Sequence, residues 1–68
     1  MDLWDAIKAI AVEERALVHD EESGELSYND DPEADKRVYA RAFQSWAAGE
    51  IDGSAQVIFA TIREVLVL

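Results

Sequence analysis

The sequence has no cysteine, a single histidine and few basic residues, with six Lys and Arg against fifteen Asp and Glu. Without cysteine there is no disulfide and no thiolate metal site, and one histidine rules out the two-histidine zinc motifs. The net charge of −9 opposes binding to nucleic acid and to anionic membranes, because both require Lys and Arg to neutralise phosphate. We therefore predict no metal, no cofactor and no direct contact with nucleic acid or membrane.

Long apolar runs are also missing. No run approaches the ~18–20 residues of a membrane span, and no basic segment precedes an apolar core near Met1, so we expect a cytoplasmic protein without a signal peptide. Half of the residues are apolar, which is typical of a folded chain, and 68 residues predict a single domain over 1–68. A chain this short with no nucleophile–base pattern is not expected to be an enzyme.

Hydrophobic periodicity predicts an all-α fold, a compact three-helix domain with an acidic loop between the first two helices. The first helix is expected over residues 2–18, with Asp2 as its N-cap. The second helix is expected to begin after the N-cap Asp31, with proline at its first position, and to end at Gly49. Two tryptophans, Trp4 and Trp46, are expected to anchor the core.

The third helix is expected from its N-cap Ser54 to the end of the chain, although its β-branched residues leave a strand as an alternative. Its apolar residues spread around the whole helix, more than one buried face requires. They are Val57, Ile58, Phe59, Ile62, Val65, Leu66, Val67 and Leu68. We predict homodimerisation through this helix, and the alternative is a central helix covered by both neighbours.

The negative charge is concentrated in residues 20–35. This stretch contains no base, and the other 52 residues hold seven acids and six bases, so it carries −8 of the total −9. Like charges four residues apart on a helix, as at Asp31 and Asp35, cost about 0.2–0.5 kcal/mol. Glu33 is expected to be partly offset by Arg37, four residues further on. An uncompensated cost indicates a functional surface. We predict that the partner-binding residues are Asp20, Glu21, Glu22, Glu25, Asp30, Asp31, Glu33 and Asp35.

A concentrated negative field favours docking onto a basic surface and accelerates association. Carboxylates spaced by several ångströms resemble a row of phosphates in charge density, so a basic nucleic-acid-binding protein is the predicted partner. The alternative is that the acidic loop only keeps the protein soluble. The chain would then be a small helical interaction or assembly module, homo-oligomeric or antitoxin-like.

Two weaker patterns indicate other chemistry. With Gly24 at the sixth position, residues 19–30 follow the spacing of an EF-hand calcium loop, but the first position lacks an oxygen ligand and the last lacks the bidentate glutamate. The segment 52–54, Asp-Gly-Ser, resembles the Asp-Ser-Leu attachment motif of acyl carrier proteins, but a glycine intervenes and no leucine follows. We therefore prefer the N-cap role for Ser54.

The short length, the strong acidity, the absence of cysteine and the acidic run 20–35 together resemble small phage-encoded anti-CRISPR proteins and other DNA mimics. Anti-CRISPR families share no diagnostic motif, so the resemblance assigns no role to any single residue. It implies a non-enzymatic inhibitor that occupies the basic DNA-binding channel of a CRISPR effector complex in the bacterial host cell. Among such complexes, the membership of the group favours type I.

Overall fold

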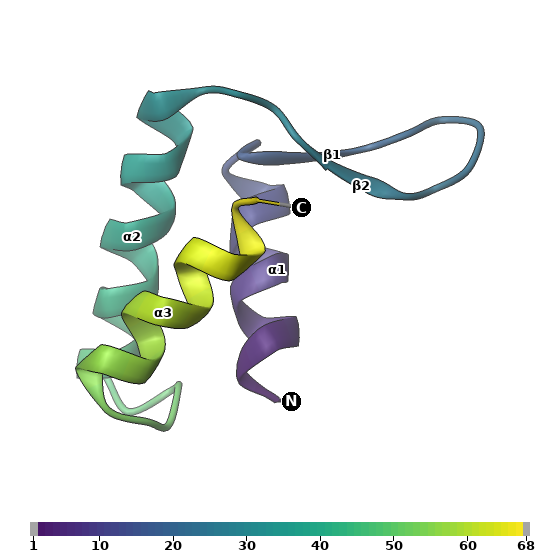
Figure 1. Cartoon of the computed structure of the whole chain (residues 1–68). Coiled ribbons are helices and arrows are strands. Elements are labelled where there is room, and N and C mark those ends of the chain that lie inside the picture. Colours follow the sequence, from purple (N-terminus) through teal and green to yellow (C-terminus); the bar gives the residue numbers. More distant parts are fainter. Residues whose placement is uncertain (1, 68) are drawn as a thin grey trace.

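The computed structural model describes residues 2–67, which form three helices and a two-stranded hairpin (Figure 1). Helix α1 spans Leu3–Glu13, strands β1 and β2 span Leu17–His19 and Leu26–Tyr28, α2 spans Pro32–Ala47, and α3 spans Ala55–Val65. Each helix packs against the other two, and α3 crosses the antiparallel pair α1 and α2 obliquely (Figure 1). The prediction of three helices in a compact body is confirmed.

The core lies where the apolar faces of the three helices meet. Helix α2 contributes Ala34, Val38 and Ala42, which are four residues apart and therefore share one face. All buried residues among those described are apolar. Besides these three, the buried residues are Ile7, Ile10, Ala11, Ala16, Leu17, Ile51, Ile58, Ile62, Val65 and Leu66.

The two expected tryptophan anchors pack at the edge of this core. Trp4 and Trp46 are both partly buried against it. The indole Nε1 of Trp46 donates a hydrogen bond of 2.7 Å to the carbonyl of Gly53, and its ring meets Phe43 edge-on, with centroids 6.1 Å apart. Trp46 therefore ties the connection between α2 and α3 to the end of α2.

Local capping signals set most helix ends. The side chains of Asp2, Asp31 and Ser54 accept hydrogen bonds from backbone N–H groups in the first turns of α1, α2 and α3, at distances between 2.9 and 3.3 Å. Gly49, with φ of 80°, follows the last turn of α2 in a Schellman motif. The helix prediction for the last segment is confirmed over 55–65, and the strand alternative is wrong.

The predicted end of the first helix is wrong, because α1 stops at Glu13 and not at Val18. Arg15 adopts a left-handed backbone with φ of 64°, and its N–H and that of Ala16 donate to carbonyls of the last helical turn at 3.1 and 2.9 Å. This is again a Schellman motif, whose left-handed position usually holds glycine. With arginine there, the sequence carries no glycine signal for the helix end.

Replacing Arg15 with glycine is expected to stabilise the protein. The left-handed conformation costs a non-glycine residue about 1–2 kcal/mol, and the greater freedom of glycine in the unfolded chain offsets part of that gain. We expect a net gain of about 0.5–1 kcal/mol, which raises Tm by about 2–8 °C for a domain of this size. Thermal unfolding followed by circular dichroism measures this, and Arg15→Ala, which removes the same charge, should bring no gain. Equal Tm values for the two variants would contradict the strain at this position.

The expected acidic loop between the first two helices is corrected to a β-hairpin followed by a short connection. Strands β1 and β2 pair antiparallel, with Leu17 opposite Tyr28 and His19 opposite Leu26. Leu17 is buried in the core and anchors the base of the hairpin, while the turn at residues 20–25 stands away from the helices (Figure 1). The fold is therefore not purely helical, and the hairpin carries part of the acidic run outward.

Candidate interaction surface

The turn of the hairpin is ordered by its own hydrogen bonds. Asp20 Oδ1 accepts from the backbone N–H groups of Glu22 and Ser23 at 2.7 and 3.2 Å, and Ser23 Oγ accepts from the N–H of Glu25 at 3.2 Å. The N–H of Asp20 donates to the carbonyl of Glu25 at 2.8 Å, and Gly24 supplies a left-handed φ of 73°. The turn therefore presents its carboxylates on a defined backbone.

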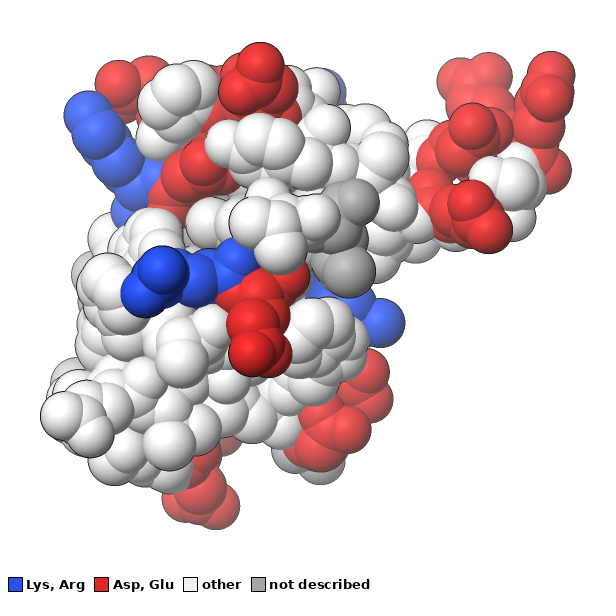
Figure 2. Space-filling view, viewed as in Figure 1, with Lys and Arg blue, Asp and Glu red and all other residues white. Residues whose placement is uncertain are grey.

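Four of the predicted site residues lie in this turn, and we call Asp20, Glu21, Glu22 and Glu25 the tip group. All four are exposed, and no Lys or Arg within residues 2–67 pairs with any of them. Figure 2 shows the tip group as a red cap at the end of the projecting hairpin, separated by white surface from the acids over the helices.

The other four predicted residues, Asp30, Asp31, Glu33 and Asp35, surround the start of α2, and we call them the helix-start group. Asp30 is exposed with a left-handed φ of 52°, and Asp31 caps the helix. Glu33 lies 3.4 Å from Lys36, so its expected offset by Arg37 is wrong. The eight acids of 20–35 thus form two groups in space, and only part of the helix-start group is free of other roles.

Two arginines of α2 form ion pairs with acids at the end of α1. Arg37 Nε lies 3.1 Å from Glu14 Oε1, and Arg41 Nη1 lies 2.6 Å from Glu13 and 3.0 Å from Glu14. The hydrogen bonds to Glu13 and Glu14 raise the pKa of the Arg41 guanidinium. Because these bases pair with acids outside 20–35, the charge of the acidic run is left almost unneutralised.

A cleft that the sequence did not predict opens beside the helix-start group, with a volume of about 490 Å³. Tyr28 Oη donates a hydrogen bond of 2.6 Å to Asp35 Oδ2, while Asp35 Oδ1 is buried with no donor among the described residues. The ring of Tyr39 packs against Phe59 with centroids 5.2 Å apart. The cleft brings together Tyr28, Asp35, Tyr39, Arg63, Leu66 and Val67.

These residues come from β2, α2, the last turn of α3 and the two residues that follow α3, so no local pattern in the sequence places them together. The alternation of Leu26 and Tyr28 with polar neighbours is the only trace of β2, and it says nothing about the position of Asp35. The cleft follows from tertiary packing alone.

The electrostatics of the cleft are dominated by carboxylates at one end. The hydrogen bond to Asp35, the loss of solvent around the hydroxyl and the charges of Asp35, Asp30 and Asp31 raise the pKa of Tyr28 to about 12. Burial raises the pKa of Tyr39, an effect that nearby Arg63 opposes and Asp35 reinforces. The cleft is therefore negative at the Tyr28 end and positive at the Arg63 end.

Replacing Asp35 with asparagine is expected to lower the pKa of Tyr28 toward its ordinary value of 10. A raised pKa means that folding favours the protonated phenol, so this contribution to stability is complete below pH 10 and is lost as the pH rises through about 12. Phenolate absorbance measures the titration. In a Tyr39→Phe background Tyr28 is the only tyrosine, so its midpoint can be read with and without Asp35→Asn. An unchanged midpoint would contradict the role of Asp35.

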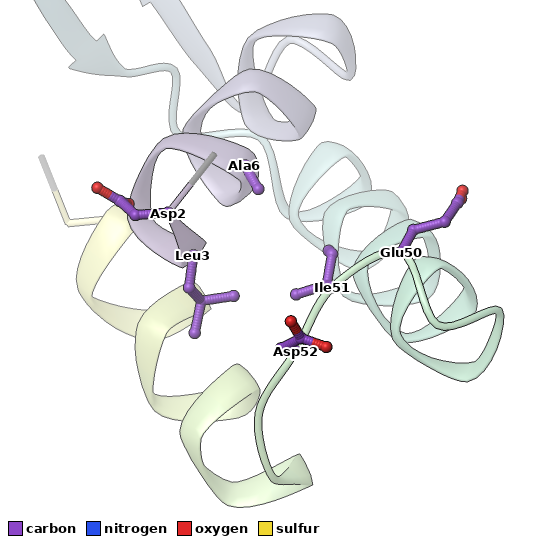
Figure 3. A pocket seen from close by; sticks show the side chains of 6 residues that line it. All are labelled: Asp2, Leu3, Ala6, Glu50, Ile51 and Asp52. Atoms are coloured by element: carbon purple, nitrogen blue, oxygen red, sulfur yellow. The ribbon is translucent and has the colours of Figure 1, made fainter.

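A second hollow, of about 380 Å³, lies between the start of α1 and the connection before α3. Leu3 and Ile51 face each other across it, while Asp2 and Glu50 point away on opposite sides (Figure 3). Asp2 is also occupied as the N-cap of α1. The carboxylates around this hollow do not converge on one point.

Within residues 2–67 no group of three or more His, Asp or Glu side chains is arranged to hold a metal ion, so the EF-hand-like spacing assembles no ligand set there. None of the described helices combines the length and apolarity that crossing a bilayer requires.

Comparison with known protein families, with curated protein sequences and with solved structures finds no match.

Proposed function

We propose that this protein is a non-enzymatic inhibitor whose acidic surface occupies the basic nucleic-acid-binding site of a target protein or complex. The observation that supports this most is the tip group. Glu21, Glu22 and Glu25 are exposed and, within the described chain, unpaired at the end of a projecting hairpin. Repulsion among them opposes folding, and a basic partner would turn that repulsion into attraction.

The shape of the hairpin suits a concave target. Two paired strands of three residues extend about 10 Å at roughly 3.3 Å per residue, enough to insert the tip group into a groove. Inside a basic groove with low-dielectric walls, the attraction between opposite charges is stronger than on a flat surface. The carboxylates would then take the places of nucleic-acid phosphates.

The resemblance to anti-CRISPR proteins in length, acidity and lack of cysteine supports a CRISPR effector complex as the target. Among such complexes, we propose a type I complex. The DNA-binding channel of such a complex has the required basic lining. The corresponding site of action is the cytoplasm of a bacterial host.

Charge reversal of the tip group tests the proposal. A purified type I effector complex is incubated with the protein and then with labelled target DNA, and bound DNA is measured by fluorescence anisotropy. Wild-type protein should prevent DNA binding, and Glu21→Lys, Glu22→Lys and Glu25→Lys together should weaken inhibition at least tenfold. Raising the salt should weaken wild-type binding, because charge attraction is screened over about 8–10 Å at physiological ionic strength.

A matched control distinguishes the effect of where the charge lies from the effect of the total net charge. Glu50→Lys, Asp52→Lys and Glu64→Lys change three exposed acids outside 20–35 and bring the net charge from −9 to the same −3. This control should inhibit nearly as well as wild type, and circular dichroism should show both variants folded. Equal inhibition by the two triple variants would contradict the assignment to the tip group, and no inhibition by wild type would contradict the target.

The second candidate function is a homo-oligomeric assembly module built on α3. Three large apolar side chains in α3 or just after it are exposed, Val57 at 50%, Phe59 at 48% and Val67 at 80%. Val57 and Phe59 lie about 200° apart around the helix at 100° per residue, so they do not form one stripe. Analytical ultracentrifugation of wild type and of the double variant Val57→Ser, Phe59→Ser tests this function. The function requires that wild type is a dimer and that the double variant is a monomer.

A further inference from the structure

The cleft beside the helix-start group combines a carboxylate, two tyrosine rings and an apolar wall. It lies next to the acidic surface but is chemically different from it, because Leu66 and Val67 line it together with Tyr28 and Tyr39. An occupant must therefore satisfy both a negative charge and aromatic or apolar surface.

Asp35, which lines the cleft, has unused capacity to accept hydrogen bonds. Asp35 Oδ2 accepts from Tyr28 at 2.6 Å, and Oδ1 is buried with no donor among the described residues. A buried polar atom without a partner is unfavourable, and an ionised carboxylate can accept several hydrogen bonds. A donor that enters from the cleft, with a rotation of the carboxylate about Cβ–Cγ, would satisfy this oxygen.

The charge around the end of the cleft at Tyr28 and Asp35 favours a cation. Asp35 accepts a hydrogen bond from the Tyr28 hydroxyl, and the charges of Asp35, Asp30 and Asp31 all favour the protonated form of this hydroxyl. Arg63 lies at the other end, near Tyr39, and it is exposed and in no ion pair within residues 2–67. Arg63 opposes a cation at its own end of the cleft, so the end at Tyr28 and Asp35 is the place for one.

We propose that this cleft binds one arginine side chain of the basic partner, an inference that rests on the proposed function. The guanidinium stacks on the exposed ring of Tyr28 and donates to Asp35, and its aliphatic stem lies along Leu66 and Val67. Arginine fits better than lysine because its planar guanidinium stacks on an aromatic face and still has N–H groups that can donate to the carboxylate. The tip group attracts the basic surface, and the cleft fixes its position.

Titration of the whole protein with short peptides tests the cleft without the partner. The probes are Ac-Gly-Arg-Gly-NH2 and its lysine and citrulline analogues, followed by amide NMR shifts. The arginine peptide should shift the amide resonances of residues around Tyr28, Tyr39 and Val67 in a saturable way. It should bind at least threefold more tightly than the lysine peptide. The citrulline peptide should show no measurable binding. Shifts confined to residues 20–25, or equal binding of all three peptides, would overturn the proposal.

Variants distinguish arginine binding in the cleft from attraction to the overall negative charge of the protein. Asp35→Asn should weaken arginine binding at least tenfold, whereas Glu22→Gln, which removes one charge from the tip group, should change it less than twofold. Val67→Trp fills the cleft from an exposed position and should block binding with Asp35 intact, which covers the case in which Asp35→Asn unfolds. Arginine binding that survives in Val67→Trp would also overturn the proposal.

The test distinguishes failure of the cleft from failure of the proposed function. The triple reversal of Glu21, Glu22 and Glu25 should lose inhibition of the effector complex but still bind the arginine peptide. If the peptide does not bind wild type while inhibition depends on the tip group, the proposed function stands and the arginine site is wrong. If the peptide binds but no effector complex does, the proposed target is wrong and the site stands.

Discussion

Replacing Ile62 with alanine is expected to lower the free energy of unfolding by about 2–5 kcal/mol. Ile62 is fully buried on α3 and belongs to the cluster formed by all three helices. A domain of 68 residues has a total stability of about 3–10 kcal/mol at 0.05–0.15 kcal/mol per residue, so this one change removes a large part of it. No disulfide compensates, because the chain has no cysteine.

Urea unfolding followed by circular dichroism measures the effect. Val57→Ala is a similar but smaller truncation on the same helix, removing two carbon atoms where Ile62→Ala removes three. Because Val57 is half exposed we expect a change of about 0.5 kcal/mol or less. Similar losses at the two positions would contradict the division of α3 into a buried and an exposed side. The same comparison tests dimerisation, since a Val57 buried in a dimer would cost as much as a core residue.

The sequence predicted those elements whose ends carry local signals. Asp31 with the following proline starts α2, Gly49 ends it, and Ser54 starts α3, and each acts within one helical turn. The prediction of the end of α1 failed because its left-handed position holds Arg15 and the apolar pattern continues through Leu17. What diverts the chain at this point is the pairing of β1 with β2, a contact between residues that the periodicity of one segment cannot show.

The hairpin also lacks a local signal in the sequence. Its six-residue turn has no Asn-Gly or Asp-Gly pair, and its order comes from the side chain of Asp20 accepting backbone hydrogen bonds. The strands are three residues long, too short for alternation to be distinct. The sequence therefore predicts a loop for this stretch of acids between two helices.

The acidic residues could be counted from the sequence but not divided by role. Asp20 orders the turn, Asp31 caps α2, Glu33 pairs with Lys36 and Asp35 accepts from Tyr28. Only the cap at Asp31 follows from sequence position. The residues left without such a role are Glu21, Glu22, Glu25 and Asp30, and three of these lie at the tip of the hairpin.

Shortening the hairpin is expected to remove binding to a basic partner while leaving the helices folded. Asp20 and Glu25 are joined by a backbone hydrogen bond of 2.8 Å, so a two-residue Asn-Gly turn can replace residues 21–24 between them. With Asp20→Thr and Glu25→Thr in addition, the whole tip group is removed and the net charge falls from −9 to −5. The core is unaffected, because the buried base of the hairpin, Leu17, stays in place.

The free energy of unfolding should stay within about 1 kcal/mol of wild type, because halving the loop saves about 0.6 kcal/mol of closure entropy and the repulsion among the tip group disappears. The association rate with a basic partner should fall by about 10- to 1,000-fold, the range over which charge steering acts. Neutralising Asp5, Glu50, Asp52 and Glu64 to their amides gives the same net charge of −5 with the tip intact, and this control should keep most of the rate. Stopped-flow association measures both variants. If the shortened variant associates as fast as the control, the charge of the tip group does not determine the association rate. The acidic run would then act through the helix-start group beside the cleft.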